Sequence, residues 1–169
     1  MPKSYIIWKW TVYSLATLAL FALQYLVLNQ IEVWGLRPFL YPMLPAVVSS
    51  YEGLRRGSVF SLCLGMVCDI LLTGPFEGFF TLTFAVIGLL SGRIGESALP
   101  SGWLCGLLVS ALALLLTGGA RILVQFLAGG GYLALMGQIT LQETLLTLPA
   151  LIAVLPLYRH IFRKLPNEY

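Results

Sequence analysis

Asp69 is an acidic residue inside an apolar stretch, and two arginines, Arg37 and Arg121, are expected at a similar depth in other apolar stretches. A charged carboxylate in hydrocarbon is unfavourable unless a cation or hydrogen-bond donors neutralise it. We therefore expect Asp69 to pair with one of these arginines or with a helix N-terminus. The alternative is a proton or ion relay, which normally uses several acids near the membrane midplane. Five other acids instead fall near the ends of the apolar stretches: Glu32, Glu52, Glu77, Glu96 and Glu143.

The side chains with catalytic potential do not form a pattern that is typical of an enzyme. His160 is the only histidine, and the sequence contains no GxSxG, HExxH or P-loop motif. The three cysteines, Cys63, Cys68 and Cys105, lack the spacing of a metal site, so we interpret them as packing residues. The sequence predicts no enzymatic activity, no cofactor and no bound metal.

The composition is typical of an integral membrane protein. Hydrophobic residues make up 59% of the 169 residues and charged residues 10%, and the mean hydropathy is +0.89. Apolar runs long enough to cross the hydrocarbon core recur along the chain. We expect an all-α fold in a single transmembrane domain over residues 1–169, a compact bundle of about six spans. These spans are 6–28, 38–51, 58–72, 76–92, 102–128 and 141–162.

The basic residues predict the orientation of this bundle. Most of them fall on alternate connections and therefore on one side of the membrane, which the positive-inside rule assigns to the cytoplasm. Both termini are expected on that side, and the net charge of +3 gives no indication of nucleic-acid binding. The residues on that side are Lys3, Lys9, Arg55, Arg56, Arg93, Arg159, Arg163 and Lys164.

Small residues recur at helical spacing in the third and fourth expected spans. Such stripes let membrane helices approach closely, because association in lipid depends on packing rather than on the hydrophobic effect. We expect the two spans to form an antiparallel hairpin joined by a tight turn at Thr73-Gly74-Pro75. The stripes consist of Gly57, Ser61, Gly65 and Asp69 on one span and Thr81, Ala85, Gly88 and Gly92 on the other.

Prolines and glycines predict irregular backbone in two other spans. Pro38, Pro42 and Pro45 remove backbone donors from the second span, so we expect a kinked or partly re-entrant segment that neighbouring helices shield. The pair Gly118-Gly119 interrupts the fifth span, so we expect that helix to break or end early. Residues 132–142 are then expected to form a loop on the outer surface.

The region around the third span resembles the family of rod shape-determining proteins called MreD. The resemblance covers the first two-thirds of the chain best, and the last two spans match only as apolar helices. It implies that positions such as Arg37, Asp69 and Gly78 matter to the fold. The residues that carry it are Arg37-Pro38, Glu52-Gly53, Arg56-Gly57, Gly65, Asp69, Gly74-Pro75, Gly78, Gly88 and Gly92.

This resemblance implies a role in bacterial cell-wall synthesis. MreD proteins are multi-pass components of the inner membrane that associate with the single-span protein MreC. The complex links actin-like MreB filaments to a SEDS glycosyltransferase and a class B penicillin-binding protein. The function expected from the resemblance is a membrane scaffold or regulatory subunit that maintains rod shape, with MreC and membrane lipids as its direct neighbours.

A compact six-helix membrane protein of this length is also similar to the substrate-binding component of an energy-coupling-factor vitamin transporter. The two families are thought to share a fold, so the fold alone does not choose between them. In the transporter interpretation, polar residues of the outer half line a pocket: Arg37, Asp69, Glu77 and Arg121, with Trp34 and Trp103 as aromatic contacts. Against it, the alanines of the first span are three residues apart rather than four: Ala16, Ala19 and Ala22.

Overall fold

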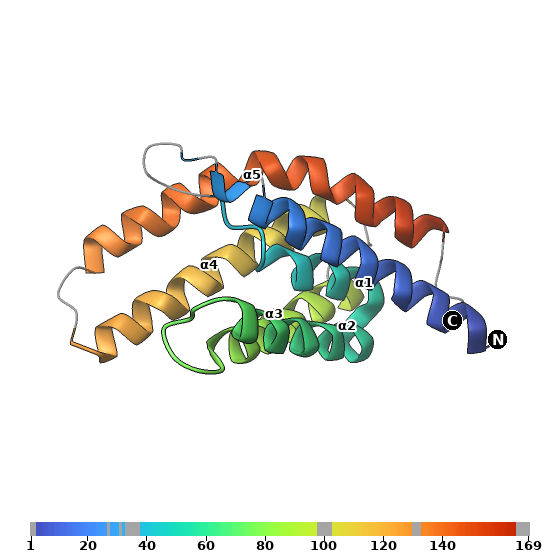
Figure 1. Cartoon of the computed structure of the whole chain (residues 1–169), viewed down its shortest axis with the longest axis horizontal. Helices are drawn as coiled ribbons and strands as arrows, with labels where there is room; N and C mark the ends of the chain where they lie inside the picture. Colours follow the sequence, from blue (N-terminus) through green and yellow to red (C-terminus); the bar gives the residue numbers. More distant parts are fainter. Residues whose placement is uncertain are drawn as a thin grey trace.

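The computed structural model of the chain is an elongated helical bundle (Figure 1), described for residues 3–26, 28–30, 32, 38–97, 103–129 and 133–164. Within these ranges the chain forms five α-helices and no strand, which confirms the expected all-α fold. The helices α3 and α4 are long and apolar enough to cross a membrane. The elements are α1 (Lys3–Leu26), the 3₁₀ turn η1 (Leu28–Gln30), α2 (Met43–Leu71), α3 (Phe79–Ser97), α4 (Trp103–Leu127) and α5 (Leu133–Lys164).

Helix α2 includes the second and third expected spans and reverses direction at Gly53. Gly53 has φ +80° and ψ 178°, a backbone conformation that glycine adopts readily and residues with a side chain rarely do. On either side of it, the Oγ atoms of Ser49 and Ser61 lie 2.8 Å apart. A Cβ atom at Gly57 would also collide with the backbone of Ser49. Residues 43–52 and 54–71 therefore pack against each other as two antiparallel halves, and five helices stand where six spans were expected.

The second half of α2 packs antiparallel against α3 through small residues. A Cβ atom at Gly65 would lie 2.6 Å from the Cα atom of Thr81, and one at Gly92 would lie 2.8 Å from the Cα atom of Leu54. Real Cβ contacts are not this short, so these positions accept glycine and little else at the present helix separation. The contacts confirm the expected hairpin and its small-residue interface.

The first half of α2 lies at the centre of the bundle. Every residue from 40 to 52 is buried, as expected for a segment that neighbours shield. The helix begins at Met43 rather than at Pro38, because residues 38–42 form an extended segment and a turn. Pro42 stands at the helix start with φ −67°, where its missing N–H is not needed. Aromatic residues of α3 complete this core: Phe79, Phe80 and Phe84.

Helices α4 and α5 differ from the irregular structure expected for them. Helix α4 continues through Gly118-Gly119 without a break, and α5 already begins at Leu133, so residues 133–142 are helical rather than a surface loop. A Cβ atom at Gly118 would collide with Thr140 of α5. This glycine therefore allows the two helices to approach closely, and the low helix propensity of glycine is overridden by packing.

The first turn of α1 and the last turn of α5 lie at the same end of the bundle (Figure 1). We call this the terminal end, and we call the opposite end, where α4 ends and α5 begins, the distal end. The outward faces of the helices carry large exposed apolar side chains along their length, as lipid-facing surfaces do. Examples are Leu15, Leu18, Ile70, Leu82, Leu104, Leu123 and Leu145.

Candidate functional site

Asp69 binds the N-terminus of α3. Its Oδ1 atom accepts a hydrogen bond from the Phe80 N–H at 2.8 Å. Its Oδ2 atom accepts from the Thr81 N–H at 2.8 Å and from Thr81 Oγ1 at 2.5 Å. The first N–H groups of a helix have no partner within the helix, and a carboxylate also complements the positive end of the helix dipole. In the described part of the chain, Asp69 thus binds a helix N-terminus, which is one of the partners that the sequence suggested.

Glu96 makes the reciprocal contact at the other end of the hairpin. It lies near the end of α3, and its Oε1 atom accepts a hydrogen bond from the Leu54 N–H at 2.7 Å. Leu54 directly follows the break at Gly53, so its N–H begins the second half of α2. Each helix of the hairpin thus carries, near its C-terminal end, an acid that binds the N-terminal amides of the other helix. The two contacts fix the register in which the helices pack.

The remaining residues of the MreD resemblance serve the hairpin or its surface. Gly88 packs directly against Ser61 of α2, at the centre of the interface. Gly78 has φ +85° at the start of α3, so a side chain there is strained. Arg56 is exposed next to the reversal at Gly53. The turn residues Gly74 and Pro75 connect the two helices, and Arg37 lies outside the described residues.

Arg121 pairs with an acid of α5. Its Nη1 atom lies 3.7 Å from Oε2 of Glu143, and the two side chains are 34% and 28% exposed. Its guanidinium carbon lies 4.4 Å from the centre of the Phe39 ring, a favourable cation–π distance. Glu143 was expected near the end of a span, but α5 begins at Leu133, so this acid lies well within the helix.

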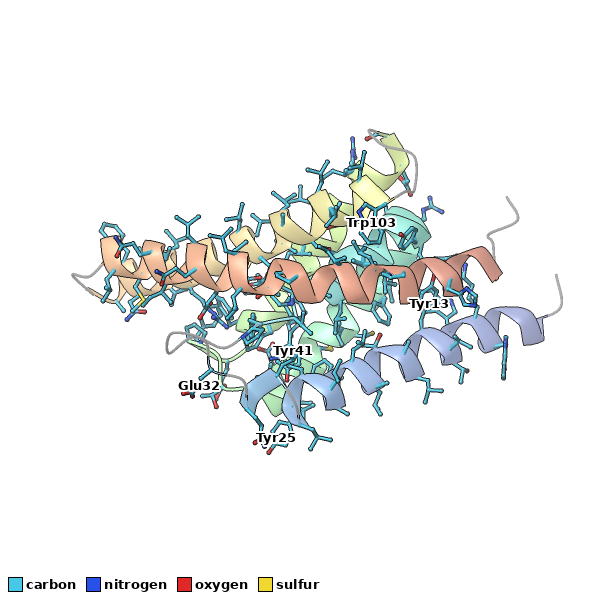
Figure 2. The ribbon with its side chains drawn as sticks, turned by 90° about the horizontal axis from the view of Figure 1, so that it is seen from above. Tyr13, Tyr25, Glu32, Tyr41 and Trp103 are labelled. Atoms are coloured by element: carbon cyan, nitrogen blue, oxygen red, sulfur yellow. The ribbon has the colours of Figure 1, made fainter. Side chains whose placement is uncertain are left out.

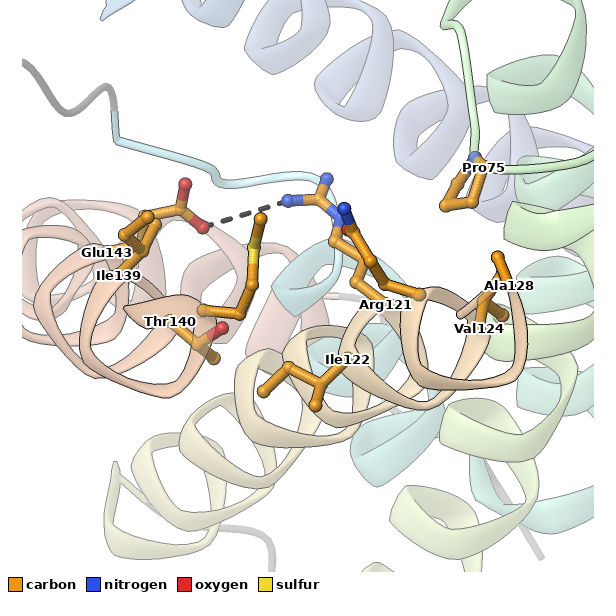
Figure 3. A pocket seen from close by; sticks show the side chains of 10 residues that line it. Pro75, Arg121, Ile122, Val124, Ala128, Ile139, Thr140 and Glu143 are labelled. Carbon is orange, nitrogen blue, oxygen red and sulfur yellow. Dashed lines mark ion pairs between the residues drawn. The ribbon is translucent and has the colours of Figure 1, made fainter. Parts of the chain in front are cut away.

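The pair of Arg121 and Glu143 lies in a cleft of about 430 Å³ between α4 and α5 at the distal end (Figure 3). Two further polar side chains, Gln125 and Thr140, also line it. The rest of the wall is apolar, with one residue from the turn after α2 and the others from the two helices: Pro75, Ile122, Val124, Ala128, Met136 and Ile139.

A second ion pair is buried near the terminal end. Lys9 Nζ of α1 lies 2.7 Å from Glu52 Oε1, and the side chains are 5% and 0% exposed. The contact is electrostatic rather than a well-aligned hydrogen bond, because among the described residues no donor has good geometry toward the Glu52 oxygens. The sequence placed both residues near the ends of spans, so their burial was missed. The pair joins α1 to the first half of α2.

Two buried polar side chains hold the extended segment that precedes α2. Gln24 Nε2 donates to the Pro38 carbonyl at 2.6 Å, and Gln24 Oε1 accepts from the Leu40 N–H at 3.1 Å. Between them, the Phe39 N–H donates to Thr147 Oγ1 at 3.2 Å. Backbone that is not helical requires such partners inside an apolar bundle. Gln24 and Thr147 therefore fix the segment that carries Phe39 to Arg121.

Most of the described residues that the transporter interpretation assigned to one pocket do not line the cleft. Asp69 accepts hydrogen bonds from the first turn of α3, and Glu77 is exposed in the turn before it. Trp103 begins α4, 18 residues before Arg121 on the same helix, about 27 Å away, and Figure 2 shows it on the other side of the view from Tyr25 and Glu32. Of the residues assigned to that pocket, the described part of the chain brings only Arg121 into the cleft. Trp34 lies outside the described residues.

Comparisons with protein-family models, with curated proteins and with solved structures find no match to this chain. Within the described ranges, His, Cys, Asp and Glu side chains do not gather into a group of three that would hold a metal ion. Fold and composition define the chain as an all-helical protein in which two helices have the length and hydropathy of membrane spans.

Proposed function

We propose that this chain is a scaffold or regulatory subunit of the bacterial elongation complex, with a role like that of MreD. In this proposal it is a multi-pass protein of the inner membrane. The two halves of α2 count as separate crossings, which gives six spans with both ends in the cytoplasm. The exposed apolar faces of the helices and the exposed Arg55, Arg56 and Arg93 support this orientation.

The observation that carries the proposal is that several of the residues behind the MreD resemblance pack closely within α2 and between α2 and α3. Gly57, Gly65 and Gly88 are in direct contact with neighbouring helix segments, and Asp69 fixes the start of α3. These residues act in helix packing rather than in chemistry. A protein whose function is to hold partner helices needs a rigid hairpin of this kind, because partner recognition in lipid depends on precise packing.

The proposed partners follow from the resemblance. A bitopic MreC-like protein is the direct partner in the membrane. The complex then includes an MreB-like filament, a SEDS glycosyltransferase and a class B penicillin-binding protein. The chain supplies helix faces to this assembly and catalyses no step itself.

A substrate-binding component of a vitamin transporter is the second candidate. The observation that favours it is the cleft of about 430 Å³ that contains Arg121, because small-molecule sites have volumes of this order. Against it, Asp69 and Glu77, which such a pocket would also use, do not line this cleft. Tight binding of a vitamin by the purified chain would favour this candidate.

Depletion of the chain from a rod-shaped host tests the proposal. Cells should widen and become round over several generations, with wall synthesis no longer confined to elongation, and an MreC-like protein should copurify with the tagged chain. Rescue by Gly65→Leu should fail. Gly119→Leu is the matched control, because a Cβ atom at Gly119 meets no atom within 4 Å. Unchanged cell shape with a new requirement for an external vitamin would contradict the scaffold proposal.

A further inference from the structure

The cleft between α4 and α5 has no role in the scaffold proposal, yet it combines an arginine with apolar walls. We propose that it binds an anionic membrane lipid, with the lipid phosphate on Arg121 and the upper acyl chain along the apolar side chains of α4 and α5. The inference rests on the geometry of the cleft and is independent of the proposed function.

Arg121 has hydrogen-bond donors available for a phosphate. The 3.7 Å between its Nη1 atom and Glu143 Oε2 exceeds hydrogen-bonding distance. No hydrogen bond joins its guanidinium to any other residue in the described part of the chain. A guanidinium has five N–H donors in a planar fork, and this fork matches the geometry of phosphate oxygens. Because the side chain is 34% exposed, a ligand in the cleft can reach it.

The position of the guanidinium is fixed before any ligand binds. The Phe39 ring covers one face of it at 4.4 Å, which leaves the N–H groups at its edge free. Phe39 is held in turn by the hydrogen bond from its N–H to Thr147 Oγ1 and by an edge-on contact with Tyr41, with ring centres 5.3 Å apart. A preorganised cation loses little entropy on binding an anion.

The surroundings of the cleft favour a lipid over free phosphate. Ile122, Met136 and Ile139 line the cleft beside Arg121. The adjoining residues of α4 include Leu123 and Leu127, which are exposed apolar residues of the outer surface. Arg121 precedes the last residue of α4 by six positions, about 9 Å along the helix, so its long side chain can extend to the interface where lipid phosphates lie.

Glu143 makes the proposal testable. In the empty cleft this acid balances the charge of Arg121, and on binding it repels the lipid phosphate. Glu143→Gln should therefore strengthen anion binding, because it removes a competing negative charge and keeps the size of the side chain. A purely structural ion pair predicts no preference of the wild-type chain for an anionic lipid, and its loss in Glu143→Gln should lower stability because Arg121 is left unpaired.

Binding is measured on the purified full-length chain in neutral detergent by native mass spectrometry. The probes are dioctanoyl phosphatidylglycerol, dioctanoyl phosphatidylcholine and inorganic phosphate. We expect the wild-type chain to prefer phosphatidylglycerol to phosphatidylcholine and to bind phosphate alone much more weakly. Arg121→Gln should weaken phosphatidylglycerol binding about tenfold or more. Arg93→Gln, at an exposed arginine outside the cleft, should leave it close to wild type.

A second comparison uses Glu143→Gln, with the exposed Glu77→Gln as its matched control. Stronger phosphatidylglycerol binding by Glu143→Gln alone supports the site, even if Arg121→Gln fails to fold. Equal affinity for the two lipids in the wild-type chain would overturn the proposal, and so would unchanged or weaker binding by Glu143→Gln. Equal affinity for inorganic phosphate would overturn the assignment of the apolar wall to an acyl chain. Because these readouts do not involve cell shape, they remain informative if the scaffold proposal fails.

Discussion

Asp69 and Thr81 are joined across the turn between α2 and α3 by two hydrogen bonds to one oxygen atom. The N–H and the hydroxyl of Thr81 both donate to Asp69 Oδ2, at 2.8 and 2.5 Å. The acid of one helix thereby occupies the position that an N-cap residue normally takes at the start of the next. The glycine interface of the hairpin depends on this contact for its register.

Replacement of Asp69 by asparagine should destabilise the hairpin. The amide keeps one acceptor oxygen, but its NH₂ group faces the donors of Phe80 and Thr81, and the favourable charge at the helix N-terminus is lost. We expect the free energy of unfolding to fall by about 0.5–2 kcal/mol, the usual range for loss of a cap. The measurement is the thermal transition of the purified chain in detergent. The matched control is Glu77→Gln, which makes the same chemical change at an exposed acid of the turn that follows α2. A transition equal to that of the wild type would contradict the role of the cap.

Replacement of Glu96 by glutamine should have a smaller effect than replacement of Asp69. The Glu96 side chain accepts one hydrogen bond, from the Leu54 N–H, and the contact is exposed, so water partly replaces the hydrogen bond that the variant loses. Asp69 lies 15 residues beyond Leu54 on the same helix, about 22 Å away. The effects of the two substitutions should therefore add in the double variant. Coupling well above measurement error in a double-mutant cycle would show that the two caps act through one another.

Substitution of Gly65 by alanine should separate α2 from α3. The added Cβ atom would lie 2.6 Å from the Thr81 Cα atom, which is backbone and moves only with its helix. Overpacking of this kind lowers stability by about 1–3 kcal/mol. Gly119→Ala makes the same chemical change where no atom lies within 4 Å. We expect the first variant to melt at a lower temperature in detergent and the second to melt at or above the wild-type temperature, because alanine favours helix more than glycine does. Equal transition temperatures of the two variants would mean that α2 and α3 can move apart without a measurable loss of stability.

The hairpin of α2 and α3 was predictable from the sequence because its signals are local. Glycines spaced four residues apart identify one helix face, and the turn residues lie directly between the two helices. The acid at Asp69 signalled a buried contact for the same reason, since a charge stands out in an apolar run. The sequence did not identify the partner of Asp69, because backbone N–H donors are present at every residue except proline and so leave no pattern in the sequence.

The contacts around Gln24, Lys9 and Arg121 were not predictable in this way. Their partners are far away in the sequence, and whether such a side chain is buried depends on the rotation of its helix in the bundle. Gln24 reads as one polar residue near a helix end, yet it binds the backbone on both sides of Phe39. The prediction of a helix break at Gly118-Gly119 was wrong for a different reason. Its intrinsic preference against helix is small beside the gain from close packing with α5.

The buried pair of Lys9 and Glu52 should be more sensitive to single than to double substitution. Lys9→Met leaves the Glu52 carboxylate, which is 0% exposed, without its cation, and Glu52→Met leaves a buried ammonium. Either change should lower stability by about 3–5 kcal/mol, whereas the double variant replaces the pair with apolar side chains of similar length and should recover most of the loss. Expression in the membrane and the thermal transition in detergent measure this pattern. If Lys9→Met alone left expression and the thermal transition unchanged, the 2.7 Å contact would contribute nothing to the packing of α1 against α2.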